Sequence, residues 1–81
     1  MILETILNKW EIKCNHTPET IDKIVMNFRK RYMTLQSLNY QKINEFEAIC
    51  TIEFEETPAG SSRIYSNMQR IEDVNDIIRI N

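Results

Sequence analysis

The stretch from Asn15 to Tyr40 constrains the fold most, because it combines a helix start with a long apolar stripe. Thr17 is a good N-cap, since its hydroxyl can accept from an unpaired N–H of the first turn. Pro18 follows at the first helical position, where a missing N–H costs nothing. Thr20 stands where a full capping box would have Glu or Gln, so the sequence predicts a single cap. The apolar residues that follow share one helical face: Ile21, Ile24, Val25, Phe28 and Tyr32. We therefore expect an amphipathic helix over residues 18–32.

Three stretches alternate as strands do. Residues 5–14 place Ile6, Trp10, Ile12 and Cys14 on one face and Lys9, Glu11 and Lys13 on the other. Residues 33–43 change phase, since Leu35 is odd-numbered but Leu38 and Tyr40 are even, and this predicts a bulge or a twist near Ser37. Asn44 and Glu45 suggest a tight turn. The clearest strand comes next, with one face formed by Phe46, Ala48, Cys50, Ile52 and Phe54.

The last third supplies one more helix and one more strand. Residues 57–61, Thr-Pro-Ala-Gly-Ser, have loop chemistry, and Ser61 is a candidate N-cap for a helix over 62–71. In the final strand, over 74–80, we expect Ile78 and Ile80 to face inward and Ile77 to face the opposite side. The order is βαββαβ. With right-handed crossovers it predicts a single α+β domain over residues 1–81, a ferredoxin-like four-stranded antiparallel sheet with both helices on one face.

Charge and length narrow the functional classes. The 81 residues carry a net charge of −2, and such a balance argues against binding to nucleic acid or to an anionic membrane surface. No apolar run approaches the roughly 20 residues that span a bilayer. The first ten residues lack a basic start and a cleavage site, so we expect a cytoplasmic protein. A domain of this size is marginal alone, and pairing with another chain would help.

The inventory of reactive side chains argues against an enzyme. Cys14 and Cys50 lack metal-ligand spacing and lie in strand-like runs, which predicts buried reduced thiols. His16 is the only histidine, and one glycine cannot build a phosphate loop or a dinucleotide fingerprint. The open sheet face would carry mixed charges instead of the stacking aromatics of an RNA-recognition module. We therefore expect no catalytic residues, no metal and no cofactor in this chain.

Two longer stretches carry a resemblance to a known family. The first runs from Thr17 to Ile24 and, past the basic helix end, through residues 33–39; the second covers residues 68–77. Together they resemble an ACT domain, and specifically the small subunit of acetohydroxyacid synthase (acetolactate synthase). The positions that fit the family pattern are Leu35, Ser37, Leu38, Arg70, Ile71, Asp73 and Val74. The resemblance covers nearly the whole chain, although each motif is short.

The resemblance implies a turn where amino-acid effectors bind, formed here by Asn15, His16, Thr17 and Glu19. Effector-sensing members usually have Asp or Asn before this turn and Gly after its proline. His16 and Glu19 occupy those places, and a glutamate adds bulk and negative charge where a ligand carboxylate would lie. The chain therefore looks most like the short, valine-insensitive form of the subunit.

The resemblance also implies partners. The expected role is activation of a separate catalytic large subunit in branched-chain amino-acid biosynthesis, and that subunit holds the thiamine diphosphate, magnesium and FAD. ACT domains commonly pair side by side, so we expect a homodimer with Leu38 and Tyr40 at its edge. The basic run Arg29, Lys30 and Arg31 is the expected contact with the catalytic subunit, with Arg63 and Arg70 as reserves.

Two other functions fit less well. A free-standing ACT domain could sense an amino acid or regulate another enzyme. A small enzyme of the same fold, such as an acylphosphatase, would need an arginine-bearing phosphate loop after the first strand. Residues 15–18, Asn-His-Thr-Pro, contain neither Arg nor Gly.

Overall fold

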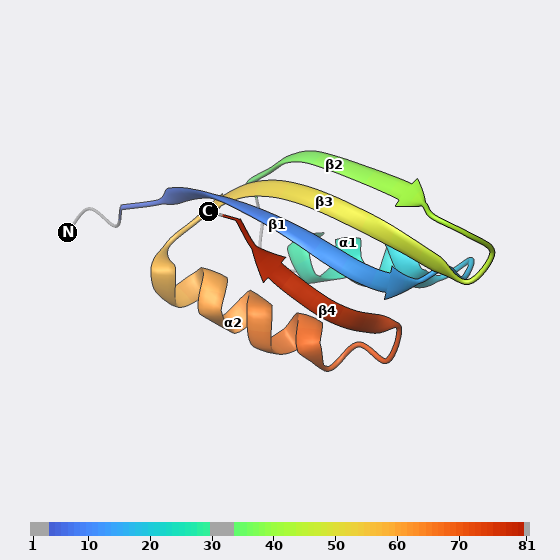
Figure 1. The fold of residues 1–81 in the computed structure, drawn as a ribbon. Helices are drawn as coiled ribbons and strands as arrows, with labels where there is room; N and C mark the ends of the chain where they lie inside the picture. The colour runs from blue at the N-terminus through green and yellow to red at the C-terminus, as the bar shows by residue number, and fades with distance from the viewer. Residues whose placement is uncertain (1–3, 30–33, 81) are drawn as a thin grey trace.

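The computed structural model describes residues 4–29 and 34–80, and their elements follow the predicted βαββαβ order (Figure 1). These elements are β1 (Ile6–Asn15), α1 (Thr20–Arg29), β2 (Thr34–Lys42), β3 (Glu47–Glu56), α2 (Pro58–Gln69) and β4 (Val74–Arg79). Across the described residues the sheet has the order β2-β3-β1-β4, with antiparallel neighbours. Figure 1 shows both helices on the same face of this sheet. The ferredoxin-like fold predicted from the sequence is confirmed.

The core lies between the helices and the even-numbered residues of β1 and β3. Trp10 is fully buried at its centre, with its ring edge-on to Phe54 at 4.9 Å and to Tyr65 at 5.8 Å between centroids. From α1, Ile24 and Phe28 are buried against this cluster, as the apolar stripe predicts. Ile6 has the core phase but is 48% exposed, so the core does not extend to the start of β1.

The predicted bulge in β2 is present. Leu35 pairs with Phe54 and Ser37 with Glu53, so one extra residue is accommodated between them. The inserted residue reverses the faces of the strand beyond it. Leu38 and Tyr40 consequently lie on the helix side, where they pack against the core.

A second bulge, in β4, makes our prediction for Ile77, Ile78 and Ile80 wrong. Val74 pairs with Cys14 whereas Asp76 pairs with Lys13, so the register shifts between these two pairs. The shift turns Ile77 inward, where it is only 8% exposed. Ile78 and Ile80 are 40% and 52% exposed. Alternation that starts at Val74 and ignores the inserted residue assigns Ile77, Ile78 and Ile80 to the wrong faces.

Phe46 was also expected in the core, and it is instead 75% exposed. It belongs to the connection between β2 and β3. There the side-chain oxygen of Asn44 accepts hydrogen bonds from the N–H groups of Phe46 and Glu47 at 2.8 and 2.9 Å. These bonds build the turn that the sequence predicted and keep Phe46 out of the strand ladder.

The second helix begins earlier than expected. Thr57 is its N-cap, with its hydroxyl accepting from the N–H of Gly60 at 3.1 Å, and Pro58 takes the first helical position. Ser61 is not a cap but lies inside the helix, where its hydroxyl donates to the carbonyl of Pro58 at 3.1 Å. The predicted loop over residues 57–61 is therefore the first turn of α2. This is the same Thr-Pro start that the sequence shows at Thr17.

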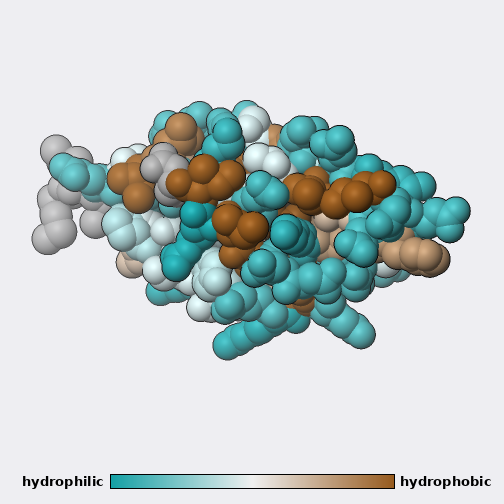
Figure 2. All heavy atoms as spheres, viewed as in Figure 1, coloured by the Kyte–Doolittle hydropathy of each residue, from teal (hydrophilic) through white to brown (hydrophobic). Residues whose placement is uncertain are grey.

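Helix α1 begins at Thr20, two residues after its predicted start, and is described as far as Arg29. Lys30, Arg31, Tyr32 and Met33 lie outside the described residues. The sheet face opposite the helices is mainly charged and polar, as predicted. Figure 2 shows hydrophobic side chains among hydrophilic ones on one side of the molecule.

Candidate functional site

The turn between β1 and α1 is held from two sides by backbone hydrogen bonds. The N–H of Asn15 donates to the carbonyl of Asp73, just before β4, at 2.7 Å. The N–H of His16 donates to the carbonyl of Phe46, just before β3, at 2.8 Å. The expected effector turn is therefore a fixed structure at one end of the sheet, beside the β2–β3 hairpin (Figure 1).

Thr20 is the centre of the hydrogen bonds within this turn and is fully buried. Its hydroxyl donates to the carbonyl of Asn15 at 2.7 Å and accepts from the N–H of Thr17 at 3.2 Å. The hydroxyls of Thr17 and Thr20 lie 2.7 Å apart. Because the single hydrogen of Thr20 is used on Asn15, Thr17 must donate in this last contact. The hydroxyl of Thr20 thus accepts from an N–H three residues earlier, as a glutamate or glutamine does in a capping box. The sequence analysis missed this role because it treated Thr20 only as a departure from that motif. The hydroxyl of Thr17, predicted to accept from an N–H of the first turn, instead bonds the hydroxyl of Thr20.

His16 and Tyr40 form the inner wall of the site. The Nδ1 of His16 is 2.9 Å from the hydroxyl of Tyr40, and the ring centroids are 5.7 Å apart. Burial raises the pKa of Tyr40, so its hydroxyl stays neutral at physiological pH. The contact ties the first turn to β2 through a phenol hydroxyl that stays protonated.

The thiols near this wall are also kept protonated. Burial is the main cause that raises the pKa of Cys14, and it raises the pKa of Cys50 to about 12. A protonated thiol is a poor nucleophile and a poor metal ligand. The two cysteines are free and buried, as the sequence predicted. Across residues 4–29 and 34–80, no three His, Cys, Asp or Glu side chains lie together in a group that could hold a metal ion.

Polar contacts on the outer side tie the turn to β4. The Nζ of Lys23 lies 3.0 Å from Oδ2 of Asp73 and 3.8 Å from Oε2 of Glu19. The hydrogen bond to Asp73 raises the pKa of Lys23. The side-chain amide of Asn75 donates to Oδ1 of Asn15 at 2.9 Å. Each residue of the expected effector turn forms a side-chain hydrogen bond or ion pair with another group of the protein: Asn15, His16, Thr17 and Glu19. Of these, Glu19 remains exposed.

The residues predicted at the dimer edge lie on β2, and the described arginines of the predicted contact surface lie on or next to the helices. Leu38 and Tyr40 were expected to face a partner, but both are half-buried against the core, because the bulge in β2 turns them inward. Strand β2 is nonetheless an edge of the described sheet. On the helices, Arg29, Arg63 and Arg70 are exposed. Lys30 and Arg31 lie outside the described residues.

Comparisons with solved structures identify the fold. The structure is similar to the ACT domain from GTP pyrophosphokinase of Chlorobium tepidum, with a TM-score of 0.79 and 9% identity over 95% of this chain and 88% of that one. It is similar to the uncharacterized protein TM1266 from Thermotoga maritima, with a TM-score of 0.75 and 9% identity over 96% of this chain and 100% of that one. It also resembles the C-terminal domain of the MgtC protein from Mycobacterium tuberculosis, with a TM-score of 0.71 and 17% identity over 90% of this chain and 83% of that one.

These likenesses show that the chain has the fold of an ACT domain, a variant of the ferredoxin-like plait. No protein-family model and no curated protein matches the sequence. None of the helices in the described part of the chain is long and apolar enough to cross a membrane.

Proposed function

We propose that this chain is a non-catalytic regulatory small subunit that activates the catalytic large subunit of an acetohydroxyacid synthase. The observation that carries the proposal is the ACT fold, which aligns over 95% of the chain with an ACT domain that is part of an enzyme. The resemblance of residues 17–24, 33–39 and 68–77 to the synthase small subunit supplies the particular partner. In this complex the thiamine diphosphate, magnesium and FAD belong to the catalytic subunit.

The geometry of the β1–α1 turn supports a subunit that does not respond to valine. The hydroxyls of Thr17 and Thr20 bond to each other, and that of Thr20 also donates to the carbonyl of Asn15. The side-chain oxygen of Asn15 accepts from the amide of Asn75. An effector would have to break these bonds before it could use the same groups. Glu19 adds an exposed carboxylate at the helix start, where an effector carboxylate would be repelled.

The proposal includes a homodimer and a basic contact surface. Strand β2, the edge strand on the far side of the sheet from β4, is the edge that we assign to the homodimer. Sedimentation at micromolar concentration tests this, and a monomer would contradict it. A Leu38→Glu variant does not test the dimer, since it would also place a charge against the core.

The decisive experiment measures acetolactate formation from pyruvate by the catalytic subunit from the same source. Adding this chain should raise turnover several-fold, because a bound subunit that favours the active conformation shifts its population. The double variant Lys30→Glu, Arg31→Glu should slow association. The matched double reversal is Arg63→Glu on α2 and Arg70→Glu at the end of that helix. Equal rates with and without saturating chain would reject the proposed function. Activation that survives the reversal at Lys30 and Arg31 would reject only that surface. If valine then binds the isolated chain at sub-millimolar concentration, a free-standing amino-acid sensor becomes the better assignment.

A further inference from the structure

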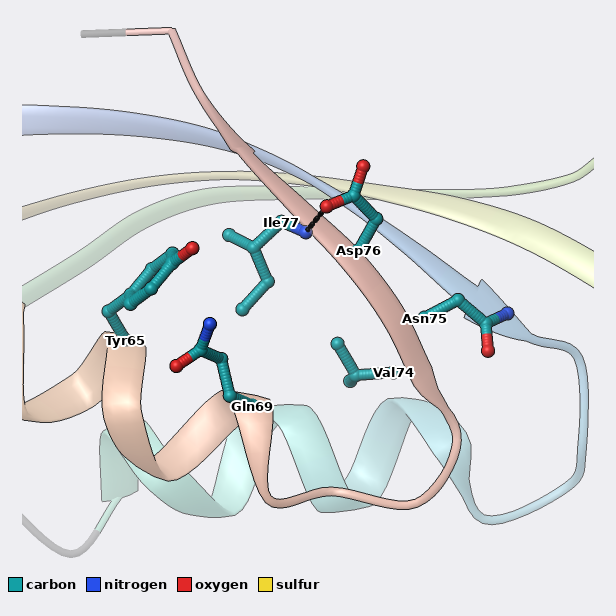
Figure 3. Close-up of a pocket in the computed structure, with 6 residues that line it drawn as sticks. All are labelled: Tyr65, Gln69, Val74, Asn75, Asp76 and Ile77. Atoms are coloured by element: carbon teal, nitrogen blue, oxygen red, sulfur yellow. Dashed lines mark hydrogen bonds between the residues drawn. The ribbon is translucent and has the colours of Figure 1, made fainter.

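A groove between α2 and β4 lies at an open edge of the sheet (Figure 3). It has a volume of about 180 Å³ and is lined by Tyr65, Gln69, Val74, Asn75, Asp76 and Ile77. Figure 3 shows the side chains of Tyr65 and Gln69 reaching from α2 toward those of Val74 and Ile77 on β4. The volume is below the roughly 300 Å³ at which cavities begin to hold drug-sized ligands. A groove of this size holds one side chain, and Tyr65, Val74 and Ile77 supply its apolar contacts beside the polar Gln69, Asn75 and Asp76.

The backbone beside this groove is available for pairing. The N–H of Ile80 donates to the carbonyl of Lys9 on β1 at 2.8 Å. Because bonding direction alternates along an antiparallel strand, the backbone groups of Ile77 and Arg79 point the other way, to the open edge. The N–H of Ile77 is bonded there to the carboxylate of Asp76, at 2.9 Å (dashed in Figure 3). A movable side chain thus takes the place that a neighbouring strand would fill.

Opposite charges mark the two ends of this edge. Asp76 and Arg79 are both exposed, and neither forms an ion pair with another residue of the described ranges. The guanidinium of Arg79 lies over the ring of Tyr65, 4.5 Å from its centroid, on the groove side of the sheet. Asp76 and Ile78 pair with Lys13 and Glu11, on the opposite side of the sheet.

We propose that β4 receives an extended peptide segment of another protein as an additional, antiparallel strand. The segment has the order acidic–apolar–apolar–basic. Its acidic residue lies opposite Arg79, its first apolar residue opposite Ile78, and its second opposite Ile77 with its side chain in the groove. Its basic residue lies opposite Asp76. Main-chain bonds give such a complex its affinity, and the side-chain positions give its specificity.

Binding exchanges one bond of Asp76 for another. The basic residue draws the carboxylate away from the N–H of Ile77, which then bonds to the peptide carbonyl. The N–H of Ile77 therefore has a partner in both states, and the exposed carboxylate of Asp76 limits unspecific pairing of the free chain. This inference is independent of the proposed synthase subunit, because it concerns a different edge and does not depend on which enzyme is bound.

The test uses the acetylated, amidated peptide Thr-Glu-Val-Leu-Lys-Thr with the full chain. We expect saturable binding at sub-millimolar concentration by calorimetry, and slower hydrogen exchange at the amide of Ile77. An N-methyl group on the leucine should weaken binding about tenfold, because it removes the N–H that donates to Ile77. The charge-swapped peptide Thr-Lys-Val-Leu-Glu-Thr should bind about tenfold more weakly.

A charge-reversal variant makes the test specific. The variant Asp76→Lys with Arg79→Glu should prefer the charge-swapped peptide, and both positions are exposed, so folding should survive. The matched control, Lys42→Glu with Glu45→Lys, makes the same exchange on exposed residues of the β2–β3 hairpin and should keep the original preference. Absence of saturation, equal binding of the N-methylated peptide, or an unchanged preference in the Asp76 and Arg79 variant would each overturn the proposal.

Discussion

Replacing Thr20 by valine should destabilise the protein strongly for so small a change. Valine has nearly the shape of threonine, so the buried site stays filled, but the hydroxyl at the centre of the turn is lost. The carbonyl of Asn15 then loses a donor at 2.7 Å, and the N–H of Thr17 loses an acceptor at 3.2 Å. A buried polar group left without its partner costs about 1–3 kcal/mol. Thr17 is partly exposed and can turn to water, so the carbonyl dominates and we expect a loss of about 2 kcal/mol.

Urea unfolding followed by the fluorescence of Trp10 measures this loss, since Trp10 is the only tryptophan and is fully buried. The control is Thr17→Val, which removes only the bond that the Thr17 hydroxyl donates to Thr20 and should cost less than about 1 kcal/mol. The Thr20→Ser variant keeps the hydroxyl and loses one methyl group, worth about 0.8 kcal/mol. The reasoning is refuted if Thr20→Val stays within about 0.5 kcal/mol of the original chain, or if Thr17→Val costs as much.

Two further predictions concern the buried thiols and the second helix. Burial raises the pKa of Cys50 to about 12 from an ordinary value near 9.0, so its contribution to stability is complete below about pH 9 and is lost as pH rises toward 12. One such group changes the free energy of unfolding by at most about 1.4 kcal/mol per pH unit. Because the loss begins only near pH 9, we expect it to reach about 1 kcal/mol at pH 10. Urea unfolding at pH 8 and pH 10 should show this loss and a smaller one in Cys50→Val; an equal loss in both would reject the assignment. At the start of α2, Thr57→Ala should cost about 1 kcal/mol by the same assay, because Thr57 caps the helix, whereas Ser61→Ala should cost less. The reverse order would restore Ser61 as the cap.

The order of elements and most of the core could be predicted from the sequence, because both follow from local periodicity. Trp10, Ile12 and Cys14 alternate with charged residues, and only one face of such a strand can be buried. The phase change between Leu35 and Leu38 is visible in the same way and correctly predicted the bulge in β2. The Thr-Pro start of α2 was equally visible, so missing that helix start was an error of interpretation.

The faces of β4 could not be predicted in this way. Three of the four residues from 77 to 80 are isoleucines, so an apolar side chain lies on each face of the strand whichever face is buried. Only pairing with β1 decides between them, since the register shift after Val74 is set by where Cys14 and Lys13 lie. For the same reason, Phe46 continues an alternating run in the sequence but leaves the sheet, because the side chain of Asn44 captures the backbone beside it.

The candidate sites depend still more on tertiary structure. The sequence locates the turn at residues 15–19, but the groups that bond to it come from Tyr40, Asp73 and Asn75, which are distant in the chain. The groove beside β4 requires a helix and an edge strand to be placed side by side. Local propensity determines which segments become helices and strands, whereas free edges, shared hydrogen bonds and cavities exist only after those segments have packed.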